Sequence, residues 1–205
     1  MSNSAQEFQR VLASRRMCRD YTEQEIEPAL LQRVLLAAFR GPTAGNTAAL
    51  DLLVLSQDQV AAYWDLTLAE EKRERFPWPG LLKAPTLVIP IVRPAAYQER
   101  YQKPDKAHTG LGESLEAWQI PYWFVDGGAG LMCLLLAAEA AGLGALLFGQ
   151  FEHEQAVSAA FGVPEHCRAL GTVALGWPAR MGRTPSASAA GGRPDPDSLI
   201  HRNRW

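Results

Sequence analysis

The sequence predicts one globular domain in which helices and a β-sheet are mixed. Two runs, 86–92 and 169–175, are apolar and rich in β-branched residues, which indicates buried strands. Apolar residues recur at helical spacing near the start of the chain, and 124–141 is long enough for a buried helix. A chain of 205 residues, 47% of them hydrophobic and 20% charged, has the size and composition of a single folded domain.

The first half of the chain alternates between helical and extended patterns. Residues 5–14 carry Phe8, Val11 and Leu12 at helical spacing and predict a short amphipathic helix. Pro28 begins a second helix, which Gly41-Pro42 ends, and the small residues that follow predict a loop. The further elements expected are a strand at 50–55, a solvent-exposed helix at 60–75 and the buried strand at 86–92.

In the second half, 124–141 forms a helix that is apolar on almost every side. Such a helix must be covered all round, which indicates that a second subunit supplies part of the cover. The poorly periodic segment 95–120 predicts either a lid-like insertion or two short helices. After the long helix we expect an extended segment at 145–148, a helix at 152–161 and the strand at 169–175.

The C-terminus has the composition of an extended arm. Gly, Pro, Ala and Ser dominate residues 183–197. This segment contains too few large apolar side chains to fold by itself. Leu199, Ile200 and Trp205 follow, which indicates an arm that docks on another surface, although a frayed terminus is the alternative. We therefore divide the chain into a domain at 1–182 and an arm at 183–205.

Charge, hydropathy and cysteine content exclude several classes of partner and location. A net charge of −2 and a pI near 6.1 provide no basic face for nucleic acid. Residues 1–16 lack an apolar signal region, and glycines and Glu139 interrupt the most lipid-like stretch, so we expect neither export nor a membrane span. Three cysteines without CxxC spacing argue against disulfides and zinc and are typical of the cytoplasm.

Several common enzyme motifs are present only in part. Gly128-Ala129-Gly130 lacks the third glycine of a dinucleotide-binding fingerprint, and Gln150 replaces the lysine of a P-loop. His153-Glu154 has no second histidine four residues later, and there is no GxSxG sequence. Hydrolase and metalloenzyme functions are therefore not supported, and we expect no metal site.

Three other segments carry residues suited to a flat, phosphorylated ligand. Arg15-Arg16-Met17-Cys18-Arg19 holds three guanidinium groups, which bind phosphate well, although a solvated basic turn is the alternative. The loop Gly41-Pro42-Thr43-Ala44-Gly45-Asn46 lets its backbone approach a flat ligand closely, or is simply a turn. The segment 142–151 (Gly-Leu-Gly-Ala-Leu-Leu-Phe-Gly-Gln-Phe) contains an apolar strand with a glycine, which can present backbone N–H groups to a ligand.

Taken in this order, these segments resemble the nitroreductase family of FMN-dependent oxidoreductases. Residues 15–21 look like the family's Arg-Arg-Ser-x-Arg-x-Phe, and 42–46 look like its Pro-Ser-x-x-Asn loop. The long helix resembles the family's dimer-interface helix, and Gly176-Trp177-Pro178 resembles its Gly-x-Pro exit. Residues 201–205 look like its basic tail. The chain departs from the pattern at Met17, which replaces Ser, and at 48–50, which replace Gln-Pro-Trp.

The resemblance implies an α+β fold, a three-layer α/β/α sandwich around a mostly antiparallel sheet, in an intertwined homodimer. FMN would lie at the interface, and the arm would cross onto the partner subunit. The residues implied to bind FMN are Arg15, Arg16, Met17, Arg19, Pro42, Thr43, Ala44, Asn46, Leu147, Phe148, Gly149, Arg202 and Arg204. Of these, Asn46 and its neighbours would come from the other subunit.

The implied activity is hydride transfer from NADPH or NADH to FMN, then to an electron-poor acceptor such as a nitroaromatic or quinone. The flavin carries this chemistry, so no catalytic side chain is expected. Other flavin chemistry (dehalogenase, flavin destructase or azoline dehydrogenase) and a non-catalytic flavin-binding dimer are the alternatives.

Aromatic residues provide candidates for the wall of a substrate pocket. They are Phe76, Trp78, Trp118 and Tyr122, with core or dimer packing as the alternative for Tyr122 and its neighbour Trp123. Several of them lie in an insertion around 76–118, which matches no subgroup of the family.

Overall fold

The computed structural model describes residues 2–179, 191–192 and 194–205, in which one sheet has five strands and every strand pairing is antiparallel. The strand order is β1-β2-β5-β3, and the short β4 also pairs with β2. The strands are β1 (Leu50–Ser56), β2 (Thr86–Val92), β3 (Gly144–Phe148), β4 (Arg168–Ala169) and β5 (Thr172–Gly176). The helices are α1 (Asn3–Ser14), α2 (Pro28–Ala37), α3 (Asp58–Thr67), α4 (Glu70–Arg73), α5 (Pro94–Tyr101), α6 (Tyr122–Ala140) and α7 (Glu154–Ala160).

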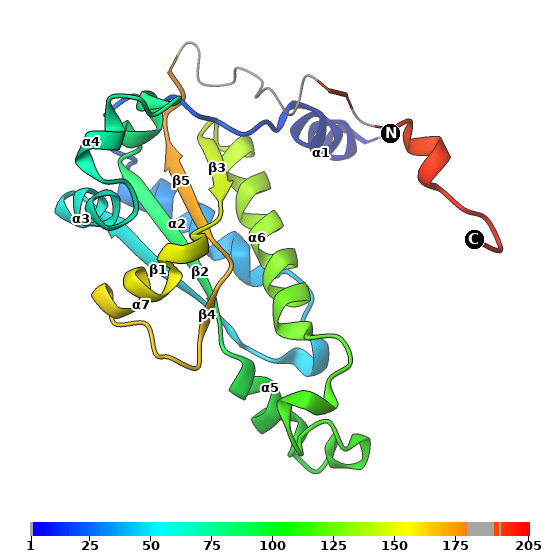
Figure 1. Ribbon diagram of the computed structural model, residues 1–205. Coiled ribbons are helices and arrows are strands. Elements are labelled where there is room, and N and C mark those ends of the chain that lie inside the picture. Colours follow the sequence, from blue (N-terminus) through cyan, green and yellow to red (C-terminus); the bar gives the residue numbers. More distant parts are fainter. Residues whose placement is uncertain (1, 180–190, 193) are drawn as a thin grey trace.

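Helices cover both faces of the sheet (Figure 1). α2 and α6 lie on one face, and α3 and α7 lie on the other. The alternation of side chains along β2 explains how one strand serves both layers. Leu87 and Ile89 pack in the core on the α3 side, while Val88 packs in the core on the α6 side. The predicted three-layer α/β/α arrangement is confirmed.

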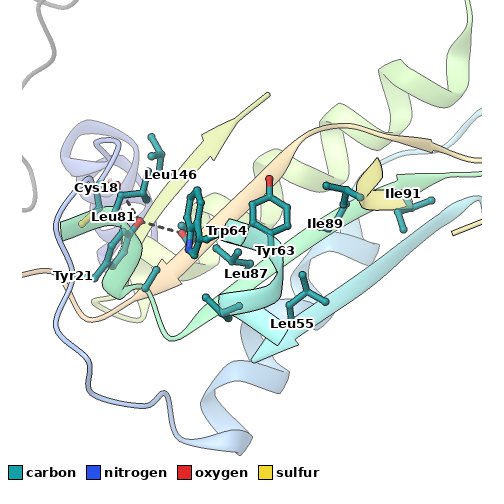
Figure 2. Packing of buried hydrophobic residues seen from close by; sticks show 14 of the residues in the cluster. Cys18, Tyr21, Leu55, Tyr63, Trp64, Leu81, Leu87, Ile89, Ile91 and Leu146 are labelled. Atoms are coloured by element: carbon teal, nitrogen blue, oxygen red, sulfur yellow. Dashed lines mark hydrogen bonds between the residues drawn. The ribbon is translucent and has the colours of Figure 1, made fainter. Parts of the chain in front are cut away.

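The chain between α1 and α2 is fastened to the edge of the sheet. Cys18 N donates to Ala145 O of β3 at 2.9 Å, and Met17 forms a parallel bridge to the same residue. The buried Tyr21 hydroxyl lies 3.0 Å from Cys18 O and 3.1 Å from Ala174 O and bonds to these carbonyls. Figure 2 shows Tyr21 and Cys18 in the same buried layer as Trp64 and Leu146. These contacts fix the arginine-rich segment beside β3.

α6 packs against α2 and the sheet at very short range. A Cβ added at Gly130 would lie 2.5 Å from Ala38 O, and one at Gly41 would lie 2.7 Å from Gly130 N. By length and composition α6 could cross a membrane, and among the described residues it is the one helix that could. Its packing against α2 and the strands places it instead in the core. Val125 and Met132 remain exposed on its outer side.

The predicted solvent-exposed helix at 60–75 is wrong in two respects. The structure has two helices there, α3 and α4, separated by Leu68 and Ala69. In addition, Val60, Tyr63 and Trp64 are buried against the sheet. The charge run after residue 69 dominated the sequence pattern, whereas the first turns of the segment carry the core residues.

Two other predicted elements, the strand at 169–175 and the insertion around 76–118, differ from the structure. The strand expected at 169–175 is split into β4 and β5 at Gly171, whose φ is +119°. The segment 76–118 contains β2, a central strand, so it is not one continuous insertion. Within 95–120 the chain forms α5 and two 3₁₀ turns, and Tyr97, Tyr101 and Trp118 are buried there.

We predict that Gly130→Ala lowers the free energy of unfolding by about 1–3 kcal/mol, because the new methyl group would overpack against Ala38 O. Gly128→Ala, on the same helix, is the matched control. A Cβ there meets nothing within 4 Å in this chain, so its effect lies between neutral and a gain of about 1 kcal/mol. Urea unfolding measures both variants, and equal losses would contradict the close approach.

Candidate functional site

The arginine cluster, Arg15, Arg16 and Arg19, lies beside the edge strand β3. Arg16 Nη1 donates to Ala13 O at 2.7 Å and to Arg15 O at 2.8 Å. The salt bridges among the described residues do not include any of the three. Glu139 of α6 lines a small hollow with Arg15 and Arg16, which leaves the cluster with a surplus of positive charge. The cluster is therefore suited to an anion with more than one negative charge.

A pocket of about 380 Å³, which we call the aromatic pocket, lies between β3, α3 and the segment before β2. Its volume is in the range of pockets that bind small molecules. Arg19 lines it, so the pocket begins where the arginine cluster ends. Among the predicted site residues, the structure also brings Phe76, Trp78, Leu147, Phe148 and Gly149 to this pocket.

The walls of the aromatic pocket are flat and apolar. The rings of Trp64 and Phe148 are parallel, with centroids 5.7 Å apart and an angle of 10°. Phe76 meets Trp78 edge to face, and the Arg19 guanidinium lies 5.3 Å from the centre of the Trp78 ring, a cation–π contact. Such walls favour a planar ring as ligand.

Below these rings, Tyr63 belongs to a buried polar network. Its hydroxyl lies 2.8 Å from Thr172 Oγ1, which also accepts from Gln150 Nε2 at 3.0 Å. Burial raises the pKa of Tyr63 to about 12, so the phenol stays protonated and neutral near pH 7. Tyr63 therefore serves as a hydrogen-bonding group and not as a charge.

A second pocket, which we call the loop pocket, has about 350 Å³ and lies at the start of α6. Thr43 and Asn46 of the small-residue loop line it, together with Trp123 and Asp126. Asp126 Oδ2 accepts from Ala44 N at 2.6 Å and from the Tyr97 hydroxyl at 2.7 Å. One carboxylate oxygen thus holds the loop and a buried tyrosine together. Pro42 is exposed on the same loop.

The segment after β2 supports the loop and does not form a free lid. Arg100 Nε donates to Gly45 O at 2.7 Å, and Arg100 is itself held by Asp105. Gly45 has a φ of +64°, and a Cβ there would lie 2.9 Å from the Tyr101 ring. Only glycine combines that backbone angle with so close a neighbour without strain.

Sequence reasoning missed Asp126, Tyr97 and Arg100 as parts of this site. A signal for Asp126 was available, because an acidic residue at the start of an otherwise apolar helix needs a buried partner. Tyr97 and Arg100 gave no such signal, because their partners lie 29 and 55 residues away along the chain.

The arginine cluster and the loop lie far apart within one chain. The loop bonds to Asp126 near the start of α6, whereas Arg15 and Arg16 border Glu139 near its end. Thirteen residues of α-helix separate these two positions, about 20 Å along the axis. The aromatic pocket and the loop pocket share no lining residue.

Four other predicted site residues are not gathered at the aromatic pocket. Trp118 is buried near α5, and its Nε1 donates to Leu111 O at 2.9 Å. Tyr122 is 39% exposed at the start of α6. Arg202 and Arg204 are exposed in the C-terminal segment and line neither of the two pockets.

Comparison with known proteins supplies the classification. The profile of the nitroreductase family matches residues 12–177. The chain belongs to the nitroreductase family. This match covers the arginine cluster, both pockets and the whole sheet, and it confirms the resemblance predicted from the sequence motifs.

Individual members of the nitroreductase family resemble the chain over most of its length. A protein of Archaeoglobus fulgidus, provisionally named NADH dehydrogenase/NAD(P)H nitroreductase, is 23% identical over 98% of this chain and 99% of its own. An NADH dehydrogenase of Thermus thermophilus is 28% identical over 82% of this chain and 85% of its own. The structure of the Vibrio harveyi NADPH:FMN oxidoreductase with NAD⁺ has a TM-score of 0.69 at 15% identity, covering 97% of this chain and 78% of that one. This structural likeness supports the fold.

We predict that Asp126→Ala lowers the free energy of unfolding by about 2–4 kcal/mol. The substitution leaves Ala44 N–H and the buried Tyr97 hydroxyl without their shared acceptor. Asp126→Asn keeps a carbonyl oxygen at that position and should lose less than half as much. Denaturant unfolding gives the stabilities, and hydrogen exchange at Ala44 reports on the loop. Equal losses in the two variants would contradict the role of the shared oxygen.

Proposed function

We propose that this nitroreductase-family protein binds FMN, takes hydride from NADPH or NADH and reduces an electron-poor acceptor such as a nitroaromatic or quinone in a ping-pong cycle. One observation carries the proposal: a cluster of three arginines runs directly into a flat aromatic pocket, with Arg19 belonging to both. FMN joins a dianionic phosphate to a planar ring system, so its two ends match these two features. The family and the names of its members support an oxidoreductase.

In this proposal the arginine cluster binds the phosphate. Arg15 and Arg16 can offer forked N–H groups to two oxygens at once, and Arg19 joins them on the side of the pocket. Met17 has no hydroxyl, so the phosphate relies here on guanidinium groups and backbone. When bound, the flavin ring supplies the redox chemistry.

The residues of the pocket position the ring and limit access of water to it. The exposed Gly149 and its neighbour Phe148, at the end of β3, would lie beside the ring with their backbone N–H groups. Phe76 and Trp78 would form the wall over which a flat acceptor enters.

We further propose that the protein is a homodimer in which the loop of one subunit completes the pocket of the other. Within one chain the loop lies too far from the arginine cluster to share a ligand with it, as described above. The side that holds α1, α2 and α6 exposes large apolar side chains, which a partner would cover. They are Phe8, Leu12, Leu36, Phe39, Tyr122, Phe124, Val125 and Met132.

The C-terminal arm is proposed to cross onto that partner. Residues 183–190 and 193 of the arm lie outside the described residues. Leu199, Ile200 and Trp205 are exposed in this chain, and Trp205 is 98% exposed. A partner surface would cover them and would bring Arg202 and Arg204 toward the phosphate site.

We place the protein in the cytoplasm. All three of its cysteines, Cys18, Cys133 and Cys167, belong to the described residues, and no disulfide joins any two of them. Cysteines that do not pair as disulfides are typical of a reducing compartment, which supports this location.

The cofactor and its site can be tested with the purified protein. We expect a yellow protein that releases FMN on denaturation and is bleached by NADPH or NADH in a stopped-flow instrument. Arg15→Ala and Arg19→Ala should each weaken FMN binding by about 1.5–3 kcal/mol, the scale of a charge-assisted hydrogen bond. Arg33→Ala, an exposed position on α2, is the control. FMN affinity unchanged in both variants would refute the phosphate assignment.

The dimer predicts a link between assembly and flavin retention. Val125→Asp and Met132→Asp place a charge on the exposed apolar side of α6 and should yield monomers that lose FMN. Ala156→Asp, on the exposed side of α7, should leave both unchanged. Light scattering and the absorbance of bound flavin measure the two properties. A stable wild-type species of 22.5 kDa with native circular dichroism would refute the dimer.

A further inference from the structure

Phe151 has a backbone conformation that is unfavourable for a bulky side chain. Its φ is +47°, in the left-handed region, where the Cβ of an L-residue lies too close to a carbonyl oxygen of the backbone. Glycine adopts this angle without the clash. A turn that needed only this angle would be better served by glycine, so the phenyl ring at this position requires a reason of its own.

The Phe151 ring is also exposed to solvent. Its exposed fraction is 83%, higher than that of any other large apolar side chain in the described residues 2–179. The apolar side chains that the proposed dimer would cover lie on the side of α1, α2 and α6. Phe151 instead begins the turn into α7, which lies on the opposite face of the sheet (Figure 1). Neither burial in the core nor the proposed interface accounts for this ring.

The turn that carries Phe151 is held from both sides. Before it, the buried Gln150 side chain donates from Nε2 to Thr172 Oγ1 at 3.0 Å. After it, His153 N donates to Gln150 O at 2.9 Å, and α7 packs against α3. The surroundings therefore impose the unfavourable angle, and residues held in this way cluster at ligand-binding and active sites.

The Phe151 ring lies at the wall of the aromatic pocket. Phe151 and Gly149 both line that pocket. A Cβ added at Gly149 would lie 2.8–3.1 Å from three atoms of the Phe151 ring, so the ring packs on the Gly149 backbone where only glycine leaves room for it. Trp78 also lines the pocket and is 41% exposed. The pocket thus offers exposed aromatic surface from two segments that are distant in the sequence.

We propose that Phe151 is a substrate-binding residue, whose ring stacks on the flat, electron-poor acceptor at the solvent-facing side of the aromatic pocket. This inference rests on the proposed function, in which Phe148 and Gly149 lie beside the flavin ring. The face of a phenyl ring carries partial negative charge, so it stacks favourably on a ring from which electrons have been withdrawn. The acceptor would also remove the exposed Phe151 ring from water, which offsets the cost of the turn.

Three substitutions separate the ring of Phe151 from its backbone angle. Phe151→Gly removes the ring and relieves the backbone, Phe151→Leu keeps an apolar side chain without an aromatic face, and Phe151→Tyr keeps the aromatic ring. Gln57→Gly is the matched control, because Gln57 has a φ of +52°, is exposed and does not line the aromatic pocket.

Steady-state kinetics of the FMN-loaded protein measure the effect on the acceptor. With a flat naphthoquinone, Phe151→Gly and Phe151→Leu should raise KM about tenfold and change kcat less than twofold. Phe151→Tyr and Gln57→Gly should stay within twofold of wild type. Ferricyanide has no ring to stack, so all four variants should reduce it with the KM of wild type.

A second readout needs no turnover. The neutral, flat 2-naphthamide, which the flavin does not reduce, is titrated into the oxidised FMN-loaded protein and followed by the flavin absorbance. It should bind Phe151→Gly about tenfold more weakly than wild type, and Phe151→Tyr within twofold. Without this ligand, Phe151→Gly should melt no lower than wild type, because it relieves the left-handed angle and removes an exposed ring. Light scattering should give the same mass for both.

The inference is overturned if Phe151→Gly and Phe151→Leu keep the wild-type KM for the naphthoquinone and the wild-type affinity for 2-naphthamide. A loss of FMN affinity as large as the loss of acceptor affinity would assign the ring to the flavin instead. A lower melting temperature or a changed mass with unchanged affinities would assign it to packing or to the dimer. If wild type holds no FMN, the proposed function fails and this inference fails with it, whereas FMN-loaded variants with wild-type affinities overturn this inference alone.

Discussion

The burial of α6 against the sheet and α2 is the constraint on which the rest of this structure depends. Gly130 allows the helix to approach the backbone at Ala38, closer than any side chain would permit. Because α6 is held there, the positions of its two ends relative to the sheet are fixed. Asp126 at one end anchors the loop through Ala44, and the other end borders the arginine cluster beside β3. One helix thus positions both the loop and the arginine cluster.

The same helix links the proposed site to assembly. A helix that is apolar on nearly every side has more such surface than one sheet and α2 can cover, and the remaining side chains stay exposed in the single chain. About 20 Å of helix keeps the loop away from the arginine cluster. A second subunit would resolve both problems, because it would cover the apolar side and could present its own loop. The exposed apolar side chains and the distance between the loop and the arginine cluster therefore both support the proposed dimer.

Two sets of polar side chains in this protein differ in whether their hydrogen bonds are complete. Asp126, Tyr97 and Arg100 form contacts that are complete within the chain, and they hold backbone in place. Trp64 and Gln150 are buried more deeply than Asp126 and Arg100, and one side-chain atom of each has no hydrogen-bond partner among the described residues. The first set was hidden from sequence reasoning because its members are distant in the chain. The second set was hidden because an unpartnered atom can be recognised only once all of its neighbours are known.

The sequence by itself determined the elements whose pattern is local. The strand at 86–92 follows from its apolar, β-branched composition, and the helix from Pro28 follows from helical spacing and proline. The order of the arginine and small-residue motifs indicated the family. Tertiary structure alone decided that Tyr63 and Trp64 face the sheet and that Phe76 and Phe148 line one pocket while Trp118 lies elsewhere. Hydrophobic periodicity reports which side chains of one helix or strand share a face, and these are near neighbours in the chain. Convergence of distant side chains depends on which faces meet, and that is fixed only when the layers pack.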